Sequence, residues 1–158
     1  MTVHTFEAHQ WVPSPIEQTF GFFADAANLE AITPPFLNFR ILTTLPVAMC
    51  VGARIDYRIA LYGVPMIWKT RIERWEPGAS FVDRQLSGPY AQWIHLHTFT
   101  SVHGGTQLDD RVEYALPLDP LSRPGHRLFV RPTIERIFAH RRQVIAQRFG
   151  GGGRETAA

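Results

Sequence analysis

The sequence predicts an α+β fold in which a curved antiparallel sheet of seven strands wraps around one long C-terminal helix. Three observations lead to this prediction. The chain opens with one strand and two short helices, which is an unusual start. Runs of alternating side chains, the period of a strand, then fill most of residues 36–117. The last long segment has apolar residues at helical spacing.

The opening elements follow from local signals. Thr2–Val12 alternates loosely and is predicted to be the first strand. A short helix begins at Ser14, which can cap it, with Pro15 in the first helical position and Glu17 completing a capping box. Asp25 caps a second short helix, and two consecutive prolines end it.

Six further strands are predicted in antiparallel series, because short turns join the alternating runs. We place them at Phe36–Leu45, Ala53–Tyr62, Pro65–Trp75, Phe81–Leu86, Gln92–Phe99 and Thr106–Pro117. The hairpin signal Gly104-Gly105 separates the last two. No internal repeat or domain linker is visible, so residues 1–149 are predicted to form a single domain.

Helical spacing defines the last element, Pro132–Phe149, in which Arg141 falls in the middle of the apolar stripe. A guanidinium on a buried face needs a partner or a pocket. Arg131 precedes a proline and is biased away from helix, so any helical turn over residues 126–130 would be kinked relative to the main helix. The glycine-rich residues 150–158 are predicted to be a disordered tail. An amphipathic helix laid across a curved antiparallel sheet is the helix-grip arrangement.

Composition excludes several classes of protein. Of the 158 residues, 45% are hydrophobic and 19% are charged, which is ordinary for a globular chain. The net charge of +2 comes with scattered basic residues and does not indicate nucleic-acid binding. The single cysteine, Cys50, permits no internal disulfide. No signal peptide or membrane-spanning run is visible, so we predict a cytoplasmic location without membrane insertion. No glycine-rich phosphate loop or nucleophile elbow is present.

The most informative stretch is residues 92–99, because alternation places its aromatic and imidazole side chains on one face: Trp93, His95, His97 and Phe99. Imidazoles and large aromatic rings on a single face suit a cavity wall better than the centre of a packed core. The same alternation places polar side chains of neighbouring strands on the inner face: Asp83, Gln85, Asp110 and Tyr114.

The two histidines have three interpretations. With Asp83 or Asp110 they would form a two-histidine, one-carboxylate metal set. Alternatively, they line a polar pocket, or they are ordinary hydrogen-bonded residues of a strand. The spacing alone is weak support for a metal. We therefore favour pocket lining, and the predicted site includes no metal and no cofactor.

An acid–base site is the catalytic form of this prediction, with His95, His97, Asp83 and Tyr114 as candidate catalytic residues. A carboxylate would orient an imidazole, while Tyr114 or Arg141 would stabilise an enolate or oxyanion. The structural form is a polar network that braces the helix against the sheet, which we favour for Asp110 and Arg141.

Large apolar side chains near the gap between helix and sheet would complete a small-molecule pocket. The predicted ligand-binding residues are Trp68, Trp93, His95, His97, Phe99, Tyr114, Phe138 and Arg141.

Several local strings accompany the order of elements. They are Ala27-Asn28-Leu29 with Ile32-Thr33-Pro34, Gly63-Val64-Pro65 with Trp68, Phe81-Val82-Asp83-Arg84-Gln85, Gly88-Pro89-Tyr90, Trp93 with His95 and His97, and Ile137-Phe138 with Arg141. Over residues 3–149 the chain resembles the START-related, Bet v 1-like (SRPBCC) superfamily, which includes polyketide cyclase/dehydrase-like domains. Within it, the chain is similar to a bacterial group of ligand-binding domains of unassigned function, also found appended to nucleotide-sugar-epimerase-like chains.

The resemblance implies a helix-grip domain that binds a small, largely hydrophobic molecule between the C-terminal helix and the sheet. An enzyme of the polyketide cyclase/aromatase type is one alternative, and an accessory protein-interaction module is another. The expected partner is therefore a small hydrophobic molecule and not a nucleic acid, while association into a homodimer is left open.

Overall fold

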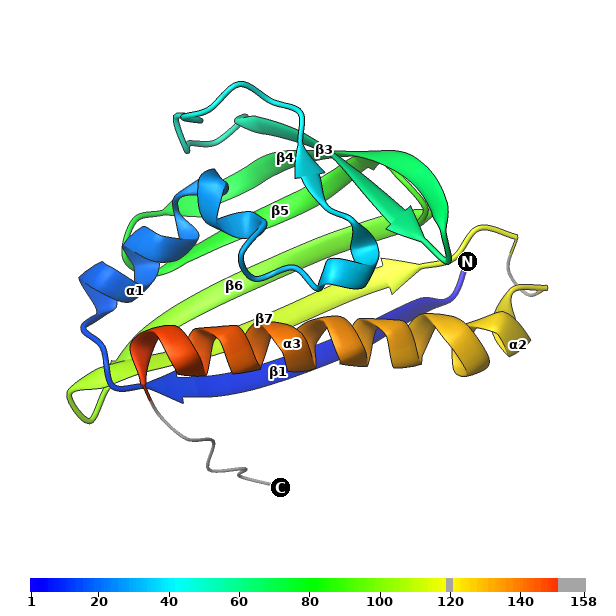
Figure 1. Ribbon diagram of the computed structural model, residues 1–158. Coiled ribbons are helices and arrows are strands. Elements are labelled where there is room, and N and C mark those ends of the chain that lie inside the picture. The colour runs from blue at the N-terminus through cyan, green and yellow to red at the C-terminus, as the bar shows by residue number, and fades with distance from the viewer. Residues whose placement is uncertain (119–120, 151–158) are drawn as a thin grey trace.

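Seven strands form one antiparallel sheet in the order β1-β7-β6-β5-β4-β3-β2 (Figure 1). The computed structural model describes residues 1–118 and 121–150. The strands are β1 (Val3–Val12), β2 (Arg40–Ile41), β3 (Arg54–Leu61), β4 (Val64–Glu76), β5 (Ser80–Ser87), β6 (Gln92–Val102) and β7 (Gly105–Ala115). The helices are α1 (Ile16–Phe23), η1 (Ala26–Leu29), η2 (Pro35–Leu37), α2 (Arg123–Gly125), η3 (His126–Val130) and α3 (Arg131–Phe149). The predicted helix-grip fold is confirmed, whereas the predicted tail lies outside the described residues from residue 151 onward.

The sheet is hollow on the side that faces α3. Strand β4 carries two register shifts against β5, between Lys69 and Thr70 and between Ile72 and Arg74. Such bulges bend a strand and increase its twist. The first strand, β1, pairs along its whole length with the last strand, β7, and α3 lies across these two strands in Figure 1. The bent sheet and the helix therefore enclose a space between them.

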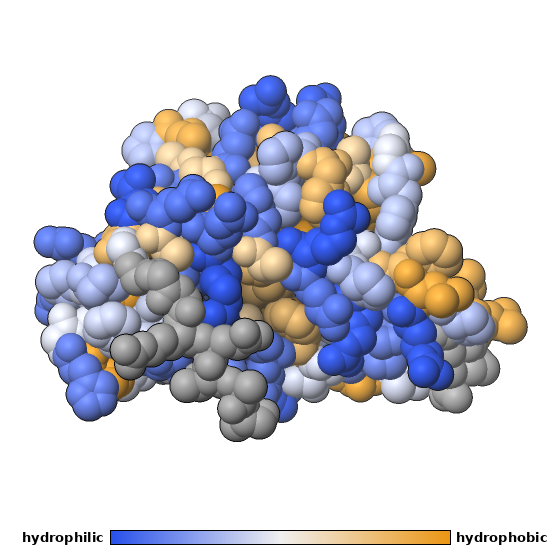
Figure 2. All heavy atoms as spheres, turned by 60° about the horizontal axis from the view of Figure 1, so that its bottom comes forward, coloured by the Kyte–Doolittle hydropathy of each residue, from blue (hydrophilic) through white to orange (hydrophobic). Residues whose placement is uncertain are grey.

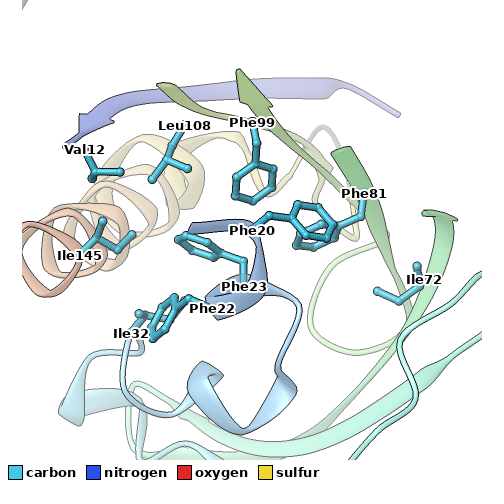
Figure 3. Close-up of a cluster of buried hydrophobic side chains, with 10 residues drawn as sticks. All are labelled: Val12, Phe20, Phe22, Phe23, Ile32, Ile72, Phe81, Phe99, Leu108 and Ile145. Atoms are coloured by element: carbon cyan, nitrogen blue, oxygen red, sulfur yellow. The ribbon is translucent and has the colours of Figure 1, made fainter. Parts of the chain in front are cut away.

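Apolar side chains from α1, the sheet and α3 fill one end of this space. The largest core cluster consists of Val12, Phe20, Phe22, Phe23, Ile32, Ile72, Phe81, Phe99, Leu108 and Ile145 (Figure 3). Three of these, Phe20, Phe22 and Phe23, come from α1, so this helix closes the sheet at that end. A separate cluster, built around Val112, Tyr114, Ile134 and Phe138, holds the middle of α3 on the sheet.

The hairpin between β6 and β7 is tight. His103 and Gly104 form its two-residue loop, and both have positive φ angles, 51° and 74°. Two such residues make the turn whose twist matches that of the flanking strands. A side chain on Gly105 would collide with the Val12 carbonyl and the ring of Trp11. The glycine pair therefore sets the register of β6 and β7.

Two predicted details of the first 45 residues are wrong. Instead of a strand over Phe36–Leu45, only Arg40–Ile41 pairs with β3, because Pro34 and Pro35 direct the chain into the 3-10 helix η2. Ser14 makes no capping hydrogen bond to α1, and its carbonyl instead accepts one from Thr106. The cap predicted at Asp25 is present, at 3.0 Å from the Ala27 N–H.

Helix α3 also begins differently from the prediction. Arg131 is helical, with φ −60° and ψ −49°, although a proline follows it. Its N–H bonds to the carbonyl of His126, five residues back, in the π-helical turn η3. The wider turn accommodates Pro132, and α2, η3 and α3 follow one another without interruption.

The start of this helix meets the β3–β4 turn. The Tyr62 hydroxyl lies 2.9 Å from Thr133 Oγ1, and its ring contacts Phe129 edge to face at 6.2 Å. Exposed apolar side chains continue from there over α2 and η3, and Figure 2 shows this surface at the right-hand end of the molecule. Among the described residues, no helix has the length and apolar character needed to cross a bilayer.

The contact between α3 and the sheet gives a stability prediction. Ile134 is fully buried on α3, so Ile134→Ala should lower the free energy of unfolding by about 2–5 kcal/mol. Ile67 is 52% exposed on β4, and the matched Ile67→Ala should cost less than about 1 kcal/mol. Urea unfolding followed by circular dichroism measures both. Equal losses in the two variants would contradict the packing of α3 described above.

Candidate functional site

A cavity of about 180 Å³ lies between the sheet, the short helices and α3. Most of its wall is apolar, with side chains from α1, η1, β3, β4 and α3. Asp83, His95 and His97 together form one polar part of the wall. The cavity therefore combines the apolar lining typical of a small-molecule site with a few converging polar groups.

Four aromatic rings form another part of the wall: Tyr57, Trp68, Tyr90 and Trp93. Trp68 is at their centre, stacked on Tyr57 at 5.8 Å and edge to face with Trp93 at 5.3 Å. Tyr90 meets both tryptophans, at 5.5 and 4.8 Å. We call these four residues the aromatic wall.

One polar atom of the aromatic wall is left without a partner. The indole Nε1 of Trp68 is buried and makes no hydrogen bond to any described residue. Burial raises the pKa of Tyr57 and of Tyr90, so both phenols stay neutral at ordinary pH. An orphaned buried N–H costs free energy. A hydrogen-bond acceptor on a molecule in the cavity would remove that cost.

The polar part of the wall is a compact cluster of imidazoles and carboxylates. Asp83, His95 and Asp110 come from three successive strands, and strand register brings them together. His95 Nε2 lies 2.7 Å from Asp110 Oδ1, and His97 Nε2 lies 2.7 Å from Asp83 Oδ2. His97 Nδ1 is 3.1 Å from the same Asp110 oxygen. The two rings face each other, with centroids 3.7 Å apart.

Arg141 reaches this cluster from α3. Its Nη2 lies 3.1 Å from Asp110 Oδ1 and 3.3 Å from His97 Nδ1. The guanidinium also lies over the ring of Phe23, 5.0 Å from the centroid. The ion pair predicted between Asp110 and Arg141 is therefore present, and it connects the helix to the sheet.

Burial and pairing set the ionisation of the cluster. Burial alone would raise the pKa of Asp110, but the Arg141 charge and the imidazole hydrogen bonds hold that pKa well below its usual value. Burial also opposes ionisation of Asp83, but the hydrogen bond from His97 and the charges of the two histidines and Arg141 together outweigh it, so this pKa is lowered too.

The pKa values of the two histidines shift in opposite directions. Burial and the neighbouring His97 charge lower the pKa of His95. Burial would lower the pKa of His97 as well, but its hydrogen bonds to Asp110 and Asp83 raise it. The cluster thus combines two carboxylates and one guanidinium with two imidazoles, of which His97 holds a proton more readily than His95.

The structure brings some of the predicted site residues to the cavity and places the others elsewhere. Trp68, Trp93, His95, His97 and Phe138 line the cavity, with Asp83 beside them. Phe99 lies instead in the main apolar cluster, against Phe20 and Phe23. Tyr114 is buried away from His95 and His97, and its hydroxyl lies 2.8 Å from Nε2 of another histidine, His126. Arg141 does not line the cavity and contacts the imidazole–carboxylate cluster from α3.

Sequence reasoning missed several cavity residues. Tyr57 shares the inward face of β3 with Ile55, Ile59 and Leu61, and the alternation of that strand would have shown this. Tyr90 lies in the connection between β5 and β6, where alternation gives no direction. Gln85 fixes it there, because its side chain bonds to both the carbonyl and the N–H of Tyr90.

No protein-family model and no curated protein matches the sequence. Solved structures do match nearly the whole chain. The ZhuI aromatase/cyclase from Streptomyces sp. R1128 matches with a TM-score of 0.74 and 15% identity over 93% of both chains. Major latex-like protein 151 from Panax ginseng matches with a TM-score of 0.65 and 12% identity over 93% of this chain and 97% of that one.

A third match involves only part of a larger protein. A nucleoside-diphosphate sugar epimerase from Corynebacterium glutamicum matches with a TM-score of 0.66 and 22% identity. The match covers 90% of this chain and 28% of the epimerase chain. Identities this low establish a shared fold. The resemblance to Bet v 1-like and polyketide cyclase-like proteins is therefore confirmed at the level of the fold.

The opposite pKa shifts of the two histidines give a prediction for metal-free protein. In a pH titration followed by nitrogen NMR, His97 should lose its proton above pH 6.5, the ordinary histidine value, and His95 should stay neutral below it. His95 should carry its proton on Nε2, which faces Asp110. Two histidines titrating together near the ordinary value would contradict the arrangement of the cluster.

Proposed function

We propose that the protein binds a small, largely hydrophobic molecule in the cavity between α3 and the sheet. The observation that carries the proposal is the cavity itself, which has apolar walls and polar groups at two separate places. The orphaned Trp68 N–H is one of them, and the imidazole–carboxylate cluster is the other.

The size and walls of the cavity indicate what such a molecule looks like. A cavity of about 150 Å³ holds one benzene ring, so the 180 Å³ here suits a buried part on the order of one or two rings. The aromatic wall favours a planar ligand, because rings stack on rings. Trp68 Nε1 would donate to an acceptor on it. The best-fitting ligand is thus a planar, mostly apolar molecule with carbonyl or hydroxyl oxygens.

An enzyme of the polyketide cyclase/aromatase type is the second candidate. The observation that favours it is the imidazole of His97, hydrogen-bonded to Asp83 at the cavity wall, where an acid–base group would be needed. An aromatase/cyclase and a di-domain ARO/CYC from a biosynthetic pathway share the fold, which supports the same candidate. For an enzyme, His97→Ala would retain ligand binding and lose turnover, whereas a binding protein has no turnover to lose.

The third alternative, an accessory protein-interaction module, has less support. Such a module would have no sizeable cavity, with Trp68 and Trp93 in solid packing. Both tryptophans instead line the cavity. A cytoplasmic location and association of two copies of the chain stay predictions from the sequence.

Native mass spectrometry of freshly purified protein, compared with its denatured mass, tests ligand binding directly. We expect an excess mass from a lipophilic compound, or uptake of added 2-naphthoate, which has two fused rings and a carboxylate. Binding of neither, in a protein whose fold is intact by circular dichroism, would count against the cavity as a ligand site.

A matched pair of substitutions locates the ligand. Trp68→Phe removes the orphaned N–H and retains an aromatic ring, so 2-naphthoate should bind about 2–10-fold more weakly. Trp11 lies on the far side of β1, where its N–H bonds to the Val102 carbonyl, and Trp11→Phe should leave the affinity unchanged. Isothermal titration calorimetry measures both. An equal effect of the two substitutions would place the ligand elsewhere.

A further inference from the structure

Three potential metal-ligand atoms converge at the polar part of the cavity wall. Asp83 Oδ2, His95 Nδ1 and His97 Nε2 all lie within 4.8 Å of one another. The carboxylate oxygen is 2.7 Å from His97 Nε2 and 3.7 Å from His95 Nδ1. Atoms bonded to one transition metal at about 2.0–2.2 Å lie roughly 3.0–3.5 Å apart. The observed distances fall on either side of this range, so small side-chain movements would complete the set.

The second nitrogen of each imidazole is held by a carboxylate outside this set. His95 Nε2 and His97 Nδ1 both bond to Asp110 Oδ1, at 2.7 and 3.1 Å. A proton on each of these nitrogens leaves the lone pairs of His95 Nδ1 and His97 Nε2 directed toward Asp83. Metal-binding histidines almost always donate their other N–H in this way, which fixes the tautomer and the ring orientation. Arg141 in turn holds Asp110.

Packing also fixes the ligand rings. Phe81 stacks on His97 with centroids 4.1 Å apart, and the edge of Phe138 meets His95 at 5.6 Å. Both histidines are at least nine-tenths buried, yet all three ligand residues border the cavity. Coordination positions that the protein does not fill would therefore face a molecule bound there.

We propose that Asp83, His95 and His97 bind one divalent transition-metal ion, of the Zn²⁺ or Fe²⁺ kind, whose open positions face the cavity. Two imidazoles and one carboxylate are a ligand set that these metals accept. Mg²⁺ and Ca²⁺ prefer sites made of oxygen ligands alone and are excluded by the donor set. The inference does not depend on which apolar molecule occupies the cavity.

The ion takes the place of a proton. In the metal-free cluster, a proton on His97 Nε2 connects it to Asp83 Oδ2. Metal binding releases this proton to solvent and frees both atoms for coordination. Asp110 and Arg141 keep their ion pair throughout. An ion at this position would polarise a carbonyl or hydroxyl oxygen of a cavity-bound molecule.

Titration of chelator-treated protein, free of any histidine tag, with Zn²⁺ and Co²⁺ tests the proposal. We expect one ion per chain, seen by calorimetry for Zn²⁺ and by the visible absorption of bound Co²⁺. His95→Ala and Asp83→Asn should abolish this binding. Asp110→Asn, which alters the support of the two imidazoles and removes the ion pair with Arg141, should weaken it about 10–100-fold.

The surface pair His9 and Asp109 provides matched controls. His9 Nδ1 lies 2.7 Å from Asp109 Oδ1, the same distance as in the cluster, but the pair is exposed and contains one histidine. His9→Ala and Asp109→Asn should bind metal like the unaltered protein. Nitrogen NMR of the unaltered protein adds a test that needs no variant: Zn²⁺ should shift His95 Nδ1 and His97 Nε2 and leave His9 unchanged.

Two results would overturn the inference. One is the absence of stoichiometric metal binding by unaltered, folded protein. The other is metal binding that survives in folded His95→Ala and Asp83→Asn, or that the controls abolish. Either result leaves the binding of 2-naphthoate untouched, so failure of the metal site and failure of the proposed ligand site are distinguishable.

Discussion

One carboxylate oxygen connects the parts of this molecule. Asp110 Oδ1 lies within 3.1 Å of atoms on His95, His97 and Arg141, which come from β6 and α3. A carboxylate buried this deeply is tolerated only when charges and hydrogen bonds compensate the loss of water. Here all three partners are nitrogen donors. The long helix is therefore held on the sheet at a polar point as well as by apolar packing around Ile134.

The contact between Asp110 and Arg141 also determines which polar groups line the cavity. Because Asp110 and Arg141 neutralise each other behind the imidazoles, Asp83 is the carboxylate that remains in the cavity wall with His95 and His97. This polar part of the wall therefore contains one carboxylate and two imidazoles, and Asp110 fixes the orientation of both rings. The aromatic wall supplies flat apolar surface and one unpaired N–H.

Much of the fold could be predicted from the sequence, because alternation and helical spacing are local signals. The inward faces of β6 and β7, and Arg141 within the apolar stripe of α3, follow from them directly. The short β2 could not be predicted, because the prolines before it outweigh the apolar run that follows. The convergence of Asp83, His95 and His97 could not be predicted either. Alternation places His95 and His97 on one face, but only register shows that Asp110 holds both.

Register has a consequence for how the chain tolerates insertions and deletions. Asp83 is paired with His95, and His97 with Asp110, as direct neighbours across β5, β6 and β7. Adding one residue inside β6 would turn the side chains beyond it to the opposite face of the sheet. Adding one in the connection at residues 88–91 would leave these pairings in place. The length of this connection can therefore vary in related chains, whereas the lengths of β5, β6 and β7 cannot.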